Sequence, residues 1–359
     1  MSIADNGGGD GAGRSLTYAE ALYEATRQEM ARDPSVFVFG LGVDDPKGMY
    51  GTTAGLHEEF GADRNFDTPL SEDAMTGVAV GAALAGMRPI HVHQRMDFLM
   101  LCMNQLVNMA AKTRYMQAGA TRVPMVVRGI IGRSWGQGAQ HSQAFHSYFM
   151  HVPGLKVVAP TTPHDAKGCM IAAIRDDNPV IFMEHRMLYG NKGLVPQEPY
   201  ALPLGRARRL SEGEDVTIVA ISHMVVEALR ARRALEEVGI AAEVIDPVSL
   251  APLDMETIAA SVAKTGRLLV VDTSWTNCGA GAEIVAQAVE RLQGQHRIRV
   301  ARLGYAPTPC PTTRPLEDIF YPNGRTIAQA AHRLVEKAPA DWRPAILEQS
   351  EIAEFRGPF

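Results

Sequence analysis

Short apolar runs alternate with segments of helical period along the first half of the chain. Thr17 and Glu20 have the spacing of a helix capping box, and the apolar run 36–39 ends at Gly40. A run that is apolar at every position predicts a strand covered on both faces, as in a parallel sheet. The alternation continues through expected helices at 71–85, 100–116 and 163–175 and expected strands at 89–92, 123–128, 155–159 and 180–184. This order predicts a doubly wound α/β domain.

A second α/β pattern follows a stretch that has no period. Residues 191–214 are interrupted by prolines and glycines, which predicts a linker between domains. Beyond it, we expect strands at 216–220, 242–245 and 267–271 and helices at 224–238, 254–263 and 280–291. The predicted organisation is a disordered tail at 1–14, α/β domains at 15–190 and 215–337 joined by this linker, and a C-terminal tail at 338–359.

Composition and charge limit the kinds of partner that the protein is expected to bind and the compartment in which it is expected to work. The 359 residues suit two domains of roughly 100–200 residues each. The formal net charge is −5 and the sequence has no basic stripe, so we expect no nucleic-acid partner. No apolar run reaches the roughly 18 residues of a membrane span, so no membrane partner is expected either. The four cysteines form no CxxC pair, which predicts reduced thiols in a cytoplasmic protein.

Two places in the sequence carry groups suited to catalysis. Glu72 opens an expected helix, where an acid is also explained by the helix dipole alone. His141 follows the glycine-rich loop 129–138, which holds Trp135 and resembles either the wall of a site or a surface loop. The histidine-rich region lacks a third ligand at zinc spacing. Neither a Gly-x-Ser-x-Gly elbow nor a dinucleotide fingerprint is present. The residues alone therefore indicate an α/β enzyme with an acid and a histidine near glycine-rich loops.

Several ordered motifs together identify a resemblance. They are DTPLSE at 67–72, AAKTRY at 110–115, GAQHSQ at 138–143, HVPGLKVVAPTTPHDAKG at 151–168, IRDDNPVIFMEHRMLY at 174–189, DVTIVAIS at 215–222 and EVIDPVSLAPLD at 243–254. Over about residues 15–335, the sequence resembles the beta subunits of the decarboxylating first component of 2-oxo acid dehydrogenase complexes, in the transketolase superfamily. The resemblance implies a pyrimidine-binding domain for thiamine diphosphate followed by a transketolase C-terminal domain.

The resemblance also implies partners. The superfamily's diphosphate and magnesium motif, GDG followed by NN, is missing, because the one GDG, at 9–11, has no such follower. The family places that motif in an alpha subunit, which would hold the magnesium ion and share the cofactor in an α2β2 heterotetramer. A lipoyl acyltransferase core is a further implied partner.

Residue roles follow from the same resemblance. Glu72 matches the glutamate that bonds to N1′ of the cofactor's aminopyrimidine. Leu70, Gln94 and Phe98 match positions that contact this ring. His141 matches the histidine that transfers a proton when the acyl group moves on. A structural potassium ion is implied near Asp176 and Asn178.

The sequence departs from the family's pattern at three places. Leu41-Gly42 stands where an acid is usual, His93 and Arg95 add basic groups around Gln94, and Asn104 replaces an Asp. His93 and Arg95 are the candidate substrate residues. Arg95 could pair with a phosphate or a second carboxylate of an unusual substrate, or it could face a subunit interface.

The leading function is decarboxylation of a 2-oxo acid and acyl transfer to a lipoyl carrier. The alternative is a split transketolase-like or acyloin-forming transferase that moves a two-carbon or acyl unit to a carbonyl acceptor. A non-catalytic assembly subunit is disfavoured because Glu72 and His141 are both present.

Overall fold

The computed structural model describes residues 14–132, 136–336 and 341–345. They form two compact units, which we describe separately. The N-terminal unit contains the described residues up to Ile131 together with Tyr148–Leu204. The C-terminal unit contains Gly205 onward and also the segment Gly132–Ser147, which comes from the middle of the first sequence domain. The sequence pattern gave no sign of this grouping.

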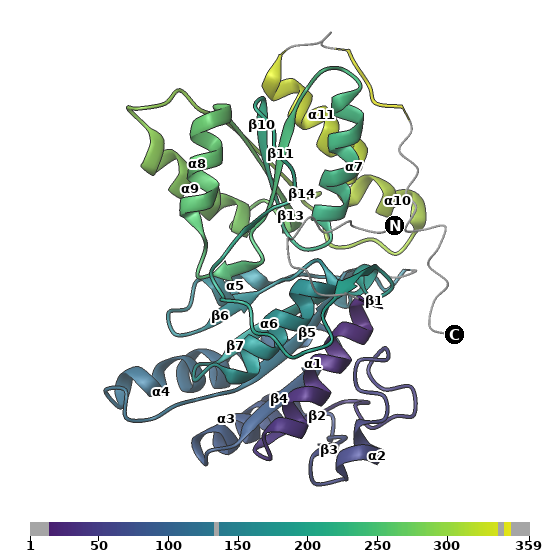
Figure 1. Cartoon of the computed structure of the whole chain (residues 1–359), viewed down its shortest axis with the longest axis vertical. Coiled ribbons are helices and arrows are strands. Elements are labelled where there is room, and N and C mark those ends of the chain that lie inside the picture. The colour runs from purple at the N-terminus through teal and green to yellow at the C-terminus, as the bar shows by residue number, and fades with distance from the viewer. Residues whose placement is uncertain (1–13, 133–135, 337–340, 346–359) are drawn as a thin grey trace. The chain divides into compact units, whose positions relative to one another are not determined.

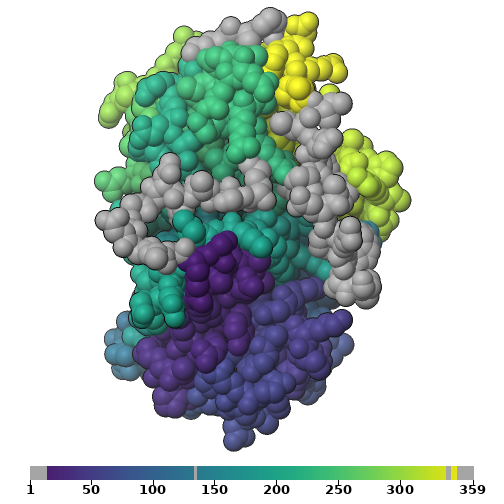
Figure 2. All heavy atoms as spheres, turned by 45° about the vertical axis from the view of Figure 1, so that its right-hand side comes forward, coloured from purple at the N-terminus to yellow at the C-terminus, as the bar shows by residue number. Residues whose placement is uncertain are grey.

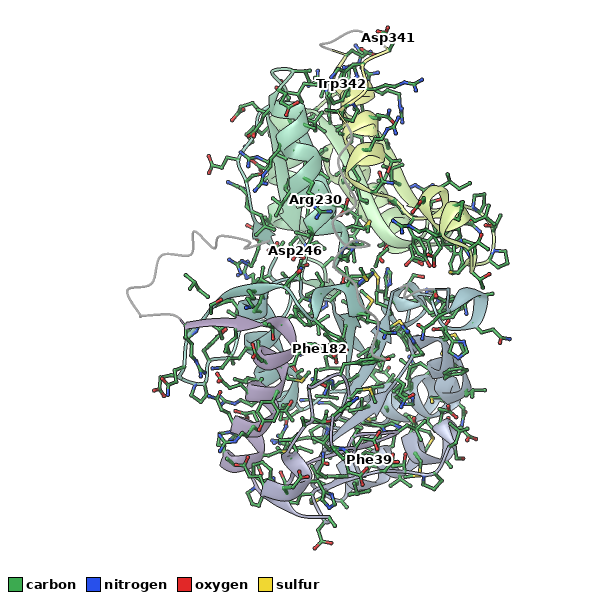
Figure 3. The ribbon with its side chains drawn as sticks, turned by 90° about the vertical axis from the view of Figure 1, so that its right-hand side faces the viewer. Phe39, Phe182, Arg230, Asp246, Asp341 and Trp342 are labelled. Atoms are coloured by element: carbon green, nitrogen blue, oxygen red, sulfur yellow. The ribbon has the colours of Figure 1, made fainter. Side chains whose placement is uncertain are left out.

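The N-terminal unit is built on a parallel sheet, as predicted. Its strands run in the order β6-β7-β5-β4-β2-β3. They are β2 (Val36–Gly40), β3 (Asn65–Phe66), β4 (Arg88–His93), β5 (Val126–Ile131), β6 (Lys156–Val158) and β7 (Val180–His185). Every residue of β2, β5 and β7 is buried, which confirms that the sheet is covered on both faces. Phe39 of β2 and Phe182 of β7 lie in this interior (Figure 3).

Helices cover this sheet on both faces (Figure 1). Helices α1 (Tyr18–Arg32) and α6 (Pro163–Arg175) pack side by side, and α3 (Glu72–Leu84) packs on β4. The Thr17 hydroxyl accepts a hydrogen bond from Glu20 N and the Glu20 carboxylate accepts one from Thr17 N, so the predicted capping box is confirmed. Figure 2 shows α1, in purple, at the surface of this unit.

The expected helix at 100–116 is instead a series of three short helical segments of different kinds. A 3₁₀ segment, η1 (Met96–Cys102), starts directly after β4, a π-helical segment, η2 (Asn104–Ala110), follows, and only α4 (Ala111–Met116) is an α-helix. Hydrophobic periodicity cannot separate these turns over so short a stretch. The remaining elements of this unit are β1 (Arg14–Thr17), α2 (Leu56–Phe60), η4 (Arg186–Leu188) and β8 (Lys192–Val195), and α5 (His146–Met150) spans the boundary of the two units.

The expected linker at 191–214 contains regular structure. Strand β8 pairs antiparallel with β1, so that Arg14 opposes Val195. Strand β9 (Arg208–Arg209) pairs antiparallel with β11 (Ala242–Asp246) of the C-terminal unit. The division between the two units falls after Leu204, inside the expected linker.

The C-terminal unit is a second α/β layer structure. Its sheet has the order β14-β13-β10-β11-β9, and its strands are parallel except for β9. The other elements are β10 (Val216–Ala220), β12 (Ser249–Ala251), β13 (Arg267–Trp275), β14 (Arg299–Tyr305), α7 (Met224–Glu236), α8 (Met255–Thr265), α9 (Ala280–Leu292), α10 (Arg314–Phe320), α11 (Gly324–Val335) and the 3₁₀ turn η3 (Gly138–Gln140). Helices α7 and α11 pack together, as do α8 and α9 (Figure 1).

Candidate active site

The carboxyl ends of β2 and β4 meet at one edge of the N-terminal sheet. Gly40 pairs with Val92, so the turn at Leu41-Gly42 lies beside Gln94. The Gln94 side-chain amide donates a hydrogen bond to the Leu41 carbonyl, with 3.3 Å between the two heavy atoms. Ligands of open parallel sheets bind at this edge, outside the carboxyl ends of the strands. Gln94 is therefore placed where a ligand is expected.

Two acidic side chains lie close to Gly42. The Gly42 N–H donates to Asp67 Oδ1 over 2.8 Å. Gly42 has a φ of +70°, and a Cβ built there would lie 3.1 Å from Asp45 Oδ2 and 3.2 Å from Gln94 Nε2. No role for Asp45 or Asp67 was evident from the sequence. Asp67 begins a recognised motif, but its contact with Gly42 comes from the tertiary fold.

Glu72 is the first residue of α3 and is half-buried. Its backbone carbonyl accepts from the Thr76 hydroxyl over 2.7 Å and from the Cys102 thiol over 3.2 Å. Within the described part of the chain, the Glu72 carboxylate accepts no hydrogen bond and forms no ion pair. The backbone of Glu72 is thus held in place while its carboxylate remains available to a ligand.

Two apolar side chains lie near this acid. Leu70, in the turn before α3, is 77% exposed. Phe98 of η1 is half-buried, and the Cys102 thiol that contacts the Glu72 carbonyl also approaches the Phe98 carbonyl at 3.9 Å. An exposed aliphatic group, an aromatic face and an unpaired acid together suit a flat heteroaromatic ring with a nitrogen acceptor. The residues present therefore fit the aminopyrimidine of thiamine diphosphate.

A role for Cys102 was not evident from the sequence, because only the fold brings it to Glu72. Burial raises the pKa of the Cys102 thiol to about 11. The thiol therefore stays protonated at neutral pH and supports the two backbone segments rather than acting as a nucleophile.

His93, which we had associated with the substrate, lies inside the N-terminal unit. It is 4% exposed, and its Nε2 lies 3.5 Å from the Thr76 hydroxyl of α3. Its ring contacts His91 edge-on at 4.2 Å, and His91 stacks on Phe39 at 4.5 Å. Burial lowers the pKa of both histidines, that of His91 to about 4. Both rings are neutral at neutral pH and pack β4 against its neighbours.

Arg95 is also buried, with 3% of its surface exposed, so it does not lie on the surface of the isolated chain. Its surroundings include Tyr50, Asp97 and Tyr189, and burial lowers the pKa of its guanidinium. Arg186, which follows β7, lies over the Tyr50 ring with its Cζ 4.6 Å from the ring centroid. Arg95 thus belongs to a buried polar cluster, and its role toward a substrate stays a prediction.

His141 lies in the segment 132–147 and thus in the C-terminal unit, whereas Glu72 and Gln94 lie in the N-terminal unit. The His141 side chain is half-buried. Trp135, which we had placed in the same loop, lies outside the described residues. Asn104 is exposed on η2, and its side-chain oxygen accepts from Asn108 Nδ2 over 3.0 Å.

The side chains of Asp176 and Asn178 are engaged by cations of the chain itself. Asp176 pairs with Lys156, and the Asn178 side-chain oxygen accepts from Arg114 over 2.8 Å. Arg88 donates to the Asp176 carbonyl over 3.0 Å. In the part of the chain that the structure describes, no group of three acidic, His or Cys side chains could hold a metal ion. A potassium ion near Asp176 and Asn178 stays a prediction.

Comparisons with known proteins agree with both units. Residues 14–192 match the family model for the transketolase pyrimidine-binding domain, and residues 205–327 match that for the transketolase C-terminal domain. The beta subunit of acetoin:2,6-dichlorophenolindophenol oxidoreductase from Cupriavidus necator is 44% identical, over 90% of this chain and 98% of that protein. The chain belongs to the beta subunits of thiamine-diphosphate-dependent 2-oxo acid dehydrogenases.

Other members of this family show similar agreement. The mitochondrial pyruvate dehydrogenase E1 subunit beta-2 of Oryza sativa is 43% identical, over 91% of this chain and 88% of that protein. The corresponding beta subunit of Rickettsia bellii is 42% identical, over 89% and 98%. A split-gene transketolase, solved as an inactive beta4 tetramer, superposes with a TM-score of 0.71 at 22% identity, over 89% of this chain and 98% of that one, and shows the same fold. The predicted family and fold are therefore confirmed.

Proposed function

We propose that this beta subunit, together with an alpha subunit, decarboxylates a 2-oxo acid and transfers the acyl group to a lipoyl carrier. The observation that carries the proposal is the Glu72 carboxylate, which is unpaired within the described residues and lies at the start of α3 beside Leu70 and Phe98. This acid belongs to a chain that is 44% identical to a subunit named for acetoin oxidation.

Each side chain has a defined task in this mechanism. Thiamine diphosphate, when bound, supplies the nucleophilic carbon and the electron sink for decarboxylation. The Glu72 carboxylate would be the group that shares a proton with N1′ of the bound cofactor, because no other partner competes for it among the described residues. Leu70 and Phe98 would orient the ring, and Gln94, just after β4, would contact it. His141 delivers a proton when the acyl group leaves.

An alpha subunit is required in this proposal. The chain lacks the diphosphate and magnesium motif, so the alpha subunit would hold the magnesium ion. Apolar side chains are exposed along α3, η1, η2 and α4, and we infer that they contact a partner in an α2β2 heterotetramer. They are Val78, Leu84, Leu101, Met109, Tyr115 and Met116. A lipoyl acyltransferase core is the second proposed partner.

The proposed location is the cytoplasm. All four cysteines are free thiols, and three of them are buried, which suits a reducing compartment. Among the described residues, no helix is both long and apolar enough to cross a membrane.

The proposal is tested with the wild-type heterotetramer, thiamine diphosphate, magnesium and a panel of 2-oxo acids. We expect at least one oxo acid to support reduction of 2,6-dichlorophenolindophenol. His141→Ala should retain most of this dye reduction but acylate a lipoyl domain about 10²–10⁴-fold more slowly, because ring opening of the lipoyl group needs a proton at sulfur. Equal loss of both activities would contradict this role for His141.

A transferase remains the second candidate, favoured by the departures at Leu41-Gly42 and Arg95. Such an enzyme would join an acyl or two-carbon unit to an aldehyde or ketone. With an aldehyde or ketose acceptor added to the assay, it would consume that acceptor, and no lipoyl domain would be acylated.

A further inference from the structure

The segment that carries His141 is tied to the C-terminal unit at several backbone positions. The Ser274 hydroxyl of β13 donates to the Ala144 carbonyl over 2.7 Å, and the Cys310 thiol lies 3.6 Å from the Ser142 carbonyl. Gly138 has a φ of +70°, and a Cβ built there would lie 2.5 Å from Thr312 Cγ2. These contacts fix the backbone on both sides of His141.

One side-chain pair adds to these backbone contacts. His146 Nε2 lies 2.9 Å from Asp272 Oδ1, and the two side chains are 0% and 3% exposed. All four side-chain nitrogen and oxygen atoms of the pair are buried, and none has an aligned hydrogen bond among the described residues. The close approach of Nε2 to Oδ1 is therefore the polar contact that each side chain makes there, and losing either one leaves the other buried without it.

Asp272 is the fixed member of the pair. It lies in β13, the strand between β10 and β14 in the sheet of the C-terminal unit. A Cβ built at Gly279, the N-cap of α9, would lie 3.2 Å from Asp272 Oδ2. The positive end of the dipole of this helix favours a negative charge at that place. His146, in contrast, lies at the start of the short helix α5, at the end of the segment that holds His141.

We propose that His146 and Asp272 are positioning residues for His141. The pair anchors the end of the segment 138–147 to β13, so that the His141 imidazole is held in one place instead of moving with a loose loop. This inference rests on the proposed function, because it takes His141 to be the proton donor. Without this anchor, we expect the His141 imidazole to be poorly oriented for proton transfer. A misplacement of a catalytic group by about 1 Å can slow a reaction about 10²-fold.

The test uses the heterotetramer and three variants. His146→Leu removes the polar contact, and His146→Gln keeps a donor at the position of Nε2. His296→Leu changes a histidine that is exposed in the same unit and serves as the matched control. We expect His146→Leu to slow lipoyl acylation about 10²-fold, with dye-coupled decarboxylation and the KM for the lipoyl domain close to wild type. His146→Gln should recover most of the rate, and His296→Leu should behave as wild type.

Amide hydrogen exchange of the same heterotetramers gives a readout that does not depend on activity. We expect faster exchange of the peptide 138–147 in His146→Leu, with unchanged exchange in α9 (Ala280–Leu292). Unchanged exchange of the peptide 138–147, or a loss of both activities in proportion to thermal stability, would overturn the positioning role. Wild-type enzyme that decarboxylates no 2-oxo acid would instead overturn the proposed function, and the exchange result would still decide the anchor.

Discussion

At the scale of single residues, Glu72 bears most directly on the chemistry. Its carboxylate has no partner among the described residues, while Asp73 beside it is exposed and accepts from its own helix at Ala74 N. We expect Glu72→Gln in the heterotetramer to slow exchange of the C2 proton of bound thiamine diphosphate by about 10²–10⁴-fold, because an amide cannot share a proton with N1′ in the same way.

Asp73→Asn is the matched control for this change. It neutralises an acid in the same helical turn and should leave proton exchange near wild type. Exchange measured by nuclear magnetic resonance after acid quench distinguishes the two variants. Equal rates in Glu72→Gln and wild type would reduce Glu72 to a charge at the start of a helix.

Gly42 offers a second residue-scale prediction. Gly42 and Gly55 both have positive φ, +70° and +79°, but a Cβ at Gly55 would meet nothing within 4 Å. Alanine should therefore cost about 1 kcal/mol of unfolding free energy at either position. Only Gly42→Ala should also displace Gln94 and weaken thiamine diphosphate binding, which calorimetry on the heterotetramer measures. Equal cofactor affinity in the two variants would show that Gln94 does not help to hold the ring.

At the scale of elements, β4 carries a buried pair of histidines that makes stability depend on pH. Burial lowers the pKa of His91 from 6.5 to about 4, so the unfolded chain binds this proton more readily than the folded chain. The folded chain therefore keeps its full stability above 6.5, the pKa of His91 in the unfolded chain. It loses stability as the pH falls from there toward about 4. Between pH 7 and pH 5 this loss amounts to about 2 kcal/mol.

His91→Phe tests this dependence, because it keeps an aromatic ring against Phe39 and removes the titrating group. Urea unfolding at pH 7 and pH 5 should show a smaller loss of stability on acidification than in wild type. His151→Phe changes an exposed histidine of the same unit and should keep the wild-type difference. If His91→Phe loses as much stability between pH 7 and pH 5 as wild type, His91 is not the cause of the pH dependence.

The elements also show how far the sequence could be interpreted. The sheet around β2 and the helices α3 and α6 were predictable, because a buried strand and an amphipathic helix have different periods. The η1–η2–α4 series was not, since each of its three kinds of helix lasts only six or seven residues, too few to show its own period. Strand β14 and helix α11 were also missed. Strand β14 has exposed residues such as Arg299 and Val300 and so lacks the continuous burial that marked the other strands.

The candidate site could be predicted only where a motif carried it. Glu72 and His141 were identified through resemblance, because an acid at a helix start and a histidine in a loop are common in any fold. Asp67, Cys102 and the pair of His146 with Asp272 depend on contacts between distant segments, which no local pattern encodes. For His93, the local pattern did not show that its ring faces the interior.

At the scale of the whole molecule, the chain should be an incomplete enzyme. It lacks the diphosphate motif, so we expect the isolated chain to bind thiamine diphosphate weakly and without dependence on magnesium. Co-expression with an alpha subunit should give a heterotetramer, visible by native mass spectrometry, that binds the cofactor tightly. Tight, magnesium-dependent binding by this chain alone would mean that the diphosphate site lies here after all.

The central claim is that the assembled enzyme passes an acyl group from a 2-oxo acid to a lipoyl carrier. The most direct measurement is the intact mass of a lipoyl domain after incubation with the heterotetramer, thiamine diphosphate, magnesium and each member of a 2-oxo acid panel. The account predicts an acyl adduct with at least one oxo acid, and no adduct when Glu72 is replaced by Gln. If no oxo acid yields an adduct while an aldehyde or ketose acceptor gains a new carbon–carbon bond, the enzyme is a transferase and the account is contradicted.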